Sequence, residues 1–276
     1  MRRLLTLLTG VMMMLQVQAQ QVDVGLFLGI SNYQGDLQSK VLGGGENHIA
    51  YGVFGRYHMF DYLSFRAHVY KGALSGNDNL QAPESGRRRR NLSFRSDIME
   101  LGIQAEFNPL PLLFEESSIF APYIFAGVSG FHYKPYAFFE GKWYELQPLG
   151  TEGQAEGEEY KLFQVAIPMG IGTNIKVSDY SSIGLEFGLR KTFTDYIDDV
   201  SGVYPDIDAL SETDPLAAAL SYRMPEYYGK DDLPNPAGNQ RGSSNKDWYV
   251  FAGMTFSFNL AGLLSLGSGP GNYSPF

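Results

Sequence analysis

The 276-residue sequence contains no cysteine, only four histidines, and charged residues at only 18% of its positions. The absence of cysteine excludes a disulfide scaffold and any metal or nucleophile site that depends on a thiolate. A net charge of −9 at pH 7 argues against a nucleic-acid-binding protein, because that function needs a basic surface. With so few histidines, we expect no histidine-rich metal centre and no cofactor.

Glycine and aromatic residues are abundant instead, with 32 glycines, 18 tyrosines and 19 phenylalanines. This apolar and aromatic content excludes an intrinsically disordered chain. Together with the low charge, the composition is typical of a membrane β-barrel rather than of a cytosolic enzyme.

The first 19 residues have the pattern of a secretory signal peptide. Arg2 and Arg3 precede an apolar run at residues 4–15, and small residues around position 19 form a cleavage site after Ala19. The apolar run is too short to span a bilayer. Since no other apolar run of about 18 residues follows, a membrane form of the chain must be a closed barrel, which leaves no strand edge unpaired in lipid.

Apolar residues alternate with glycine or polar residues in eight segments. In one of them Leu185, Phe187 and Leu189 alternate with Glu186 and Gly188. The segments lie at residues 22–31, 50–59, 63–72, 99–107, 123–129, 163–174, 183–190 and 248–259. Eight segments of about the length of a tilted membrane strand predict an all-β, eight-stranded antiparallel outer-membrane barrel across residues 20–260.

The connections between these segments alternate in length. Those at residues 60–62, 108–119 and 177–180 are short, and those at 32–49, 75–93, 134–160 and 194–246 are long and polar. Outer-membrane barrels place short turns in the periplasm and long loops outside the cell. We therefore expect four long extracellular loops, periplasmic termini and a periplasmic tail at residues 261–276.

A soluble, lipocalin-like barrel would show the same alternation, so the polar face has to distinguish the two. A solvated outer face normally carries Lys, Glu and Thr, whereas here glycine dominates the polar face. Glycine fits the interior of a narrow barrel, where eight strands leave room only for side chains. The membrane barrel is therefore the favoured prediction.

The few charges on the polar face predict an ion network inside the barrel. Buried charges persist only when paired, because an isolated one costs several kcal/mol. The expected members are Arg56, Arg66, Glu100, Glu106, Glu186 and Arg190. We interpret them as lumen-filling ion pairs rather than as a general acid and base, and a lumen plugged in this way conducts little.

His58 and His68 face the same lumen, where hydrogen-bonded histidines are expected rather than metal ligands.

The expected loops contain three further features. The run Arg87-Arg88-Arg89-Arg90 suits lipopolysaccharide phosphates geometrically, but it is equally consistent with a solvated loop tip. Asp195, Asp198 and Asp199 could hold calcium, although the EF-hand spacing is absent. Asp214 followed by Pro215 predicts a short helix that ends at Arg223.

Catalytic signatures are missing from the sequence. No Ser/His/Asp order, metalloprotease motif or phosphate-binding loop appears. A lipid-modifying enzyme or protease on a small barrel would need such a cluster at the lipid-facing rim or the loop mouth, where we find only His48 and His132. We therefore expect no enzyme and no small-molecule substrate.

Four stretches of the chain resemble a known family. They are residues 32–37 (NYQGDL), 120–123 (FAPY), 149–154 (LGTEGQ) and 190–204, which includes TDYIDDVS. Over nearly the whole mature chain, the sequence resembles the PorG-type outer-membrane proteins of the type IX secretion system of Bacteroidetes. The resemblance implies a barrel that associates on its periplasmic side with the ring of the lipoprotein PorK and PorN, and it implies no catalysis.

Two further hypotheses remain open beside a structural component of that secretion system. One is the small outer-membrane enzyme, and the other is a membrane-tethering barrel with no part in secretion. If the chain binds a periplasmic ring, the apolar turn at residues 110–118 and the tail after Ala261 are the candidate contacts. The apolar residues of the turn either dock a protein or dip into the membrane interface. Outer-membrane lipid and lipopolysaccharide are the further expected partners of the barrel. The candidate residues of the turn are Leu110, Leu112, Leu113 and Phe114.

Overall fold

The computed structural model describes residues 21–38, 46–82, 84–114 and 119–262. The expected signal peptide at residues 1–19 lies outside these ranges, as does the expected periplasmic tail from residue 263 onward.

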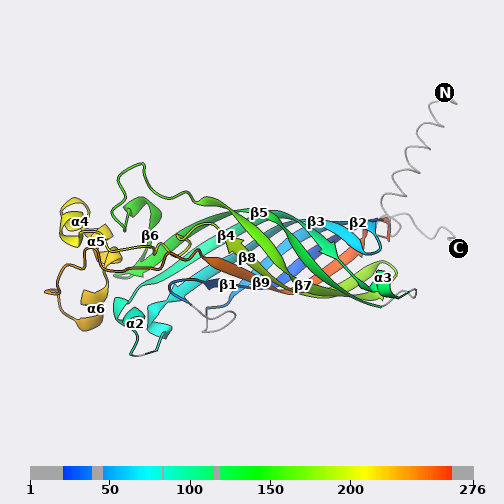
Figure 1. Cartoon of the computed structure of the whole chain (residues 1–276), viewed down its shortest axis with the longest axis horizontal. Coiled ribbons are helices and arrows are strands. Elements are labelled where there is room, and N and C mark those ends of the chain that lie inside the picture. The colour runs from blue at the N-terminus through cyan, green and yellow to red at the C-terminus, as the bar shows by residue number, and fades with distance from the viewer. Residues whose placement is uncertain (1–20, 39–45, 83, 115–118, 263–276) are drawn as a thin grey trace, which may run out of the picture.

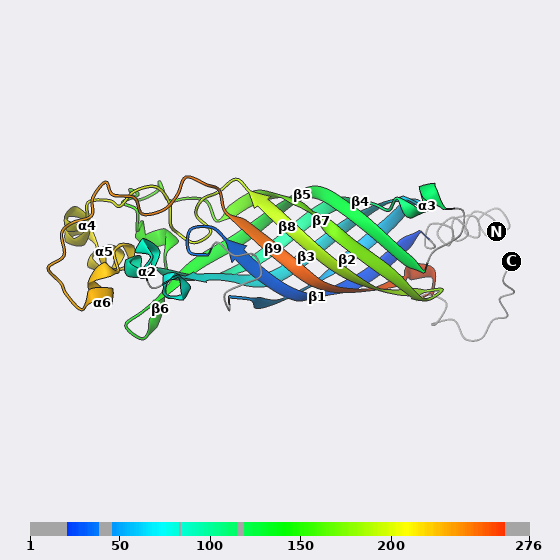
Figure 2. The ribbon, with the colours of Figure 1, turned by 60° about the horizontal axis from the view of Figure 1, so that its bottom comes forward.

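Eight long antiparallel strands form a closed barrel (Figures 1 and 2). Each strand pairs with its neighbours, and the pairing of β1 with β9 completes the circle together with the pairing of β4 with β5. This confirms the predicted eight-stranded antiparallel barrel. The strands are β1 (Val22–Gln34), β2 (His48–Phe60), β3 (Leu63–Asn77), β4 (Ser93–Phe107), β5 (Phe120–Phe139), β7 (Phe163–Ser178), β8 (Ser181–Thr192) and β9 (Trp248–Asn259).

The alternation of the sequence becomes an outer and an inner surface. On β1, Leu26 and Leu28 point outward and are 55% and 56% exposed, while Phe27 between them is 1% exposed. Because successive side chains of a strand point to opposite faces, the same pattern recurs on every strand of the barrel. The faces are those that the sequence predicts.

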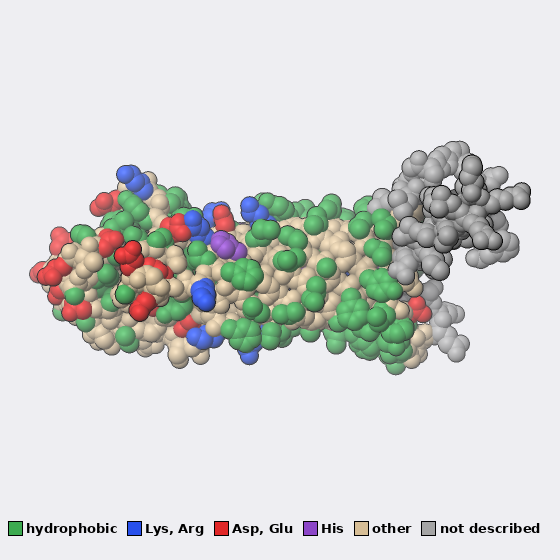
Figure 3. All heavy atoms as spheres, turned by 90° about the horizontal axis from the view of Figure 1, so that it is seen from above, with side chains coloured by type: hydrophobic (Ala, Val, Ile, Leu, Met, Phe, Trp, Pro, Cys, Tyr) green, Lys and Arg blue, Asp and Glu red, His purple; other side chains and the backbone are tan. Residues whose placement is uncertain are grey.

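The outward side chains form an apolar belt around the barrel, which is visible along its length in Figure 3. Such a surface would be strongly unfavourable in water, whereas in a bilayer it contacts hydrocarbon. Within the described ranges, no helix is long and apolar enough to cross a membrane.

Three strands continue well beyond the segments predicted for them. β3 runs to Asn77, β4 starts at Ser93 and β5 extends to Phe139, so parts of the expected loops at 75–93 and 134–160 are β-structure. A short strand, β6 (Lys142–Glu145), then pairs with the end of β5 as a hairpin. Outside the lipid the outward face becomes polar, so the sequence loses its alternation while the backbone ladder continues.

The two ends of the barrel differ, as the connection lengths predict (Figure 1). In the part of the chain that the structure describes, the end with short turns carries α3 (Leu110–Leu113) and a helical turn at 260–262, and the end with long loops carries the remaining helices. The predicted helix at 215–223 is α5 (Pro215–Ser221), capped by Asp214 but two residues shorter. Its neighbours are η1 (Asp78–Leu80), α2 (Gly86–Arg90), η2 (Gln147–Leu149), α4 (Ile207–Thr213) and α6 (Met224–Tyr228).

We predict that Leu185→Arg destabilises the inserted barrel by about 2–4 kcal/mol, because the guanidinium would face hydrocarbon in the middle of β8. Leu185 is 55% exposed and points outward. The measurement is reversible urea unfolding in lipid vesicles, with Leu185→Phe as the control that keeps the surface apolar. Equal stability of the Arg and Phe variants would reverse the assignment of the two faces.

Candidate functional site

The half of the lumen nearer the short turns contains a cluster of charged side chains that pair with one another. Glu106 accepts a hydrogen bond from Arg56 Nε at 2.7 Å, and its other carboxylate oxygen forms an ion pair with Arg66 Nε at 2.7 Å. Arg66 also pairs with Glu186, which accepts a hydrogen bond from the Tyr123 hydroxyl at 2.9 Å. The four charged side chains are buried, so each carboxylate is compensated by a guanidinium in the same layer.

A second cluster lies one layer nearer the loops. Glu100 accepts hydrogen bonds from Arg190 Nη2 at 3.3 Å and from the Tyr249 hydroxyl at 2.5 Å, and its Oε1 lies 2.8 Å from His68 Nε2. The structure thus brings together all six charged residues expected in the lumen, in two groups. Tyr123 and Tyr249 also belong to these groups, and they could not be predicted from the charged residues of the sequence because tyrosine is uncharged.

Glycines of the polar face make room for these side chains. A Cβ atom at Gly188 would overlap the Arg190 guanidinium and the Phe125 ring, and one at Gly102 would overlap His68. The glycine-rich inner face is therefore a requirement of filling a narrow lumen with large charged and aromatic groups.

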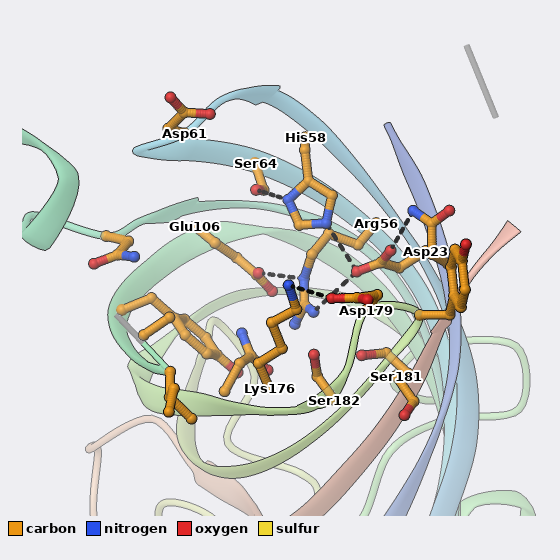
Figure 4. Close-up of a pocket in the computed structure, with 18 of the residues that line it drawn as sticks. Asp23, Arg56, His58, Asp61, Ser64, Glu106, Lys176, Asp179, Ser181 and Ser182 are labelled. Carbon is orange, nitrogen blue, oxygen red and sulfur yellow. Dashed lines mark hydrogen bonds and ion pairs between the residues drawn. The ribbon is translucent and has the colours of Figure 1, made fainter. Parts of the chain in front are cut away.

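At the short-turn end the lumen opens into a polar cavity of about 360 Å³, which we call the periplasmic cavity (Figure 4). Charged side chains from four strands point into it, among them Arg56, Glu106 and Lys176. Lys176 also pairs at 3.2 Å with Asp179 of the β7–β8 turn. The cavity ends at the Arg56–Glu106 ion pair, which forms its floor.

The wall of this cavity contains a hydrogen-bonded series that the sequence did not reveal. His58 Nδ1 lies 2.9 Å from Ser64 Oγ, and His58 Nε2 lies 2.8 Å from Asp23 Oδ2. A Ser/His/Asp arrangement cannot be recognised in the sequence because the three residues come from three strands. The pairing register places Ser64 directly opposite His58. His58 is thus hydrogen-bonded, as expected.

The turn between β4 and β5 carries the candidate partner residues. α3 lies beside the end of the barrel (Figure 2), with Leu110 half-buried and Leu112, Leu113 and Phe114 exposed by 58%, 68% and 62%. These three apolar side chains project from the short-turn end, beyond the barrel wall.

The long loops pack into a cap over the opposite end of the lumen. The Tyr33 hydroxyl lies 2.5 Å from Asp198 Oδ2 and 3.0 Å from Asp247 Oδ1. A hydroxyl has only one proton to donate, so this arrangement disfavours a negative charge on both carboxyls. Accordingly, burial raises the pKa of both Asp198 and Asp247 well above the usual range for aspartate.

A neighbouring group joins the β6–β7 connection to the β8–β9 connection around Asp199. This carboxylate accepts hydrogen bonds from the Thr151 hydroxyl and, at 2.7 Å, from the Tyr160 hydroxyl. Arg241 lies 3.8 Å from it and also pairs with Glu152 at 2.8 Å. Burial raises the pKa of Asp199 to about 6, against the opposing effect of Arg241. The TEGQ and TDYIDDVS stretches are therefore the elements that hold the loop cap together.

The structure bears on two alternatives that the sequence left open for the loops. Arg90 is buried in the cap, where it binds both carboxylate oxygens of Asp78 at 2.8 Å, so the arginine run is not simply a solvated tip. Asp198 and Asp199 are engaged by hydroxyl and backbone donors instead of converging on a common point. In the described ranges, no three His, Asp or Glu side chains are grouped so that they could hold a metal ion.

A closed barrel with an apolar belt, short turns at one end, long loops at the other and a charge-filled lumen is a small transmembrane β-barrel of the outer membrane. The short-turn end then faces the periplasm. By sequence, the chain belongs to the family described as domain of unknown function DUF6089, whose model matches residues 2–214. No curated protein matches the chain.

Solved structures similar to this chain include three small barrels. Neisserial surface protein A has 9% identity and a TM-score of 0.44, with 87% of this chain and 97% of that chain covered. Ail, the attachment invasion locus protein of Yersinia pestis, solved with the heparin analogue sucrose octasulfate, has 9% identity and a TM-score of 0.37, covering 86% and 97%. The N-terminal barrel of Pseudomonas aeruginosa OprF has 8% identity and a TM-score of 0.35, covering 87% and 98%.

We predict that Glu106→Gln lowers the free energy of unfolding by about 3–5 kcal/mol, because it leaves Arg56 and Arg66 without a shared buried counter-ion. Urea unfolding in vesicles measures the loss. Asp179→Asn, which removes an exposed carboxylate from the β7–β8 turn, is the control and should unfold like the wild type. Wild-type stability of Glu106→Gln would mean that the lumen tolerates uncompensated charge.

The raised pKa of Asp199 predicts a loop cap that is more stable in acid. The opened cap releases this proton near pH 4 and the closed cap near pH 6, so the free energy of opening falls by up to about 3 kcal/mol as the pH rises through this window. Hydrogen exchange at residues 194–201, corrected for intrinsic rates, should be slower at pH 4.5 than at pH 7.

Asp199→Asn is the test of this assignment, because an amide resembles the protonated carboxyl and Asn tolerates the positive φ of 62° at this position. The variant should show a smaller pH dependence. An unchanged dependence would assign the effect to the Asp198–Asp247 pair instead.

Proposed function

We propose that this outer-membrane barrel is a non-catalytic binding and assembly component of a secretion machine. In this proposal it is a PorG-type protein of the type IX secretion system that associates with a periplasmic PorK–PorN ring. The sequence resemblance supplies the identity of the machine. The observation that carries the binding role is a barrel filled with charge that nevertheless presents an exposed apolar turn to the periplasm.

The lumen supports binding rather than transport. Two layers of ion pairs and the aromatic rings around them fill its cross-section, with Arg66, Arg190 and Phe251 each less than 2% exposed. Moving a solute through these layers would require separating buried charges, at several kcal/mol for each. The activity is therefore expected at the ends or on the outer surfaces of the barrel rather than along its lumen.

The turn at α3 is the best candidate for the partner contact. Leu112, Leu113 and Phe114 are adjacent and more than half exposed, and their turn faces the compartment of the proposed ring. A partner would remove this apolar area from water, at about 25 cal/mol for each Å² that is buried. The alternative is that these side chains insert into the lipid interface instead of binding a protein.

A hydrolase is the second candidate, favoured by the series Ser64–His58–Asp23 in the periplasmic cavity. His58 would take the Ser64 proton through Nδ1, while Asp23 orients the ring through Nε2. The Asp23 carboxylate, however, also lies 4.0 Å from Arg56 and accepts a hydrogen bond from Asn259 at 3.3 Å. These contacts suit a histidine held between two strands, so we favour the binding role.

Charge substitutions test the proposed contact. Leu113→Asp with Phe114→Asp should release the ring lipoprotein in a pull-down from detergent-solubilised membranes and reduce secretion at least tenfold, while the barrel stays inserted and heat-modifiable. Leu80→Asp is the matched control, because Leu80 is equally apolar and 55% exposed but lies among the extracellular loops.

Three results would decide against the proposal. Wild-type ring binding by the double variant would place the contact elsewhere, and normal secretion by a deletion strain would refute the secretion role. Loss of secretion in Ser64→Ala with the ring still bound would favour the hydrolase, whereas the binding role predicts full secretion by that variant.

A further inference from the structure

Basic side chains gather where the apolar belt meets the extracellular loops. In Figure 3 they form a band between the hydrophobic barrel and the acidic loop end. On β3 and β8, Lys71 and Lys191 are the next outward residues after Val69 and Leu189, and both lysines are exposed. The other members are Arg95, His132 and Lys134, on β4 and β5.

The opposite edge of the belt differs. Among the described strand residues, the outward positions at the periplasmic edge carry no lysine or arginine, and Lys176 of β7 lines the periplasmic cavity instead. A general preference of membrane proteins for interfacial lysines would place them at both edges. The asymmetry points to an anionic group in the outer leaflet alone.

The band is deepest on the outer wall of β4, β5 and β6, where a cavity of about 290 Å³ is lined by Arg95, Asp97, Tyr136 and Trp143. The register explains why these residues meet, since Arg95 pairs with Tyr136 and Asp97 pairs with Lys134. Part of the β5–β6 extension beyond the lipid thus forms a recess that faces the membrane surface. We call it the outer-wall recess.

We propose that the outer-wall recess binds the headgroup of a phosphorylated glycolipid of the outer leaflet. This proposal rests on the membrane placement of the barrel and is independent of the secretion role. The Arg95 guanidinium offers the planar pair of donors that matches a phosphate.

The remaining groups of the outer-wall recess fit the sugar of such a headgroup. Beside the recess, Lys134 Nζ lies 2.7 Å from Glu145 Oε2 and also hydrogen-bonds the Tyr136 side chain, which leaves one proton for a phosphate oxygen. Asp97, which lines the recess, and Glu145, which pairs with Lys134 beside it, can accept hydrogen bonds from sugar hydroxyls. Tyr136 and Trp143, which also line the recess, supply aromatic surface for the sugar. A lipid with phosphate but no sugar would leave the carboxylates of Asp97 and Glu145 facing an anion, which is unfavourable.

The position of the recess beside the apolar belt also favours a lipid ligand. The recess begins directly above Met99 and Leu101, which are 53% and 63% exposed to the hydrocarbon side. Acyl chains attached to a bound headgroup can therefore lie along the apolar belt without bending. A soluble sugar phosphate would obtain the polar contacts alone.

The experiment titrates bis-phosphorylated lipid A into the full mature protein in detergent and counts bound molecules by native mass spectrometry. Arg95→Gln with Lys134→Gln should weaken binding at least tenfold, and Arg95→Gln alone should weaken it severalfold if the double variant does not fold. Lys176→Gln, which removes an exposed lysine at the periplasmic end, is the matched control and should bind within twofold of the wild type.

Two further arms identify the source of the phosphate. Dephosphorylated lipid A should bind at least tenfold more weakly, and 10 mM inorganic phosphate should not displace lipid A. Wild-type affinity of the double variant, equal binding of the dephosphorylated lipid, or displacement by inorganic phosphate would each overturn the proposal. So would an equal loss of affinity in Lys176→Gln.

Discussion

The pairing of three arginines with three glutamates inside the barrel is the interaction on which the rest of the structure depends. Arg56, Arg66 and Arg190 would each be prohibitively expensive to bury alone, yet all three are buried because a glutamate from another strand lies within hydrogen-bond distance. These pairs fix which residues face inward, and thereby which face outward. The glycines that admit them and the apolar belt around them follow from that choice.

The fold and the residues of the lumen were predictable because both depend on the alternation of side chains between the two faces of a strand. Glu186 and Arg190 stand on the polar face of their strand whatever happens in the loops, so the sequence assigns them to the lumen and requires partners for them. Their particular partners were not predictable, since these depend on the stagger of strands distant in sequence. Register places Arg66 against Glu186, 120 residues away, and brings Ser64, His58 and Asp23 into one series.

The extracellular half was predicted less well for a physical reason. Once a strand leaves the lipid, its outward face no longer has to be apolar, so β5 continues to Phe139 through Lys134 and Tyr136 without the alternation that marked it before. The loop cap depends on individual hydrogen bonds of Tyr33 and Asp199, which have no periodic signature. The outer-wall recess was invisible for both reasons, since it is made by the unpredicted extension of β5 and by β6.

The ladder between β1 and β9 has a consequence for the order of events in biogenesis. Val24 pairs with Phe258, and every other ladder of the barrel can form between segments that are much closer along the chain. Closure therefore has to wait until the chain has been synthesised and exported as far as β9. Until that moment the outward leucines and phenylalanines have no bilayer around them, so the time between translocation and closure is when the chain is most prone to aggregate.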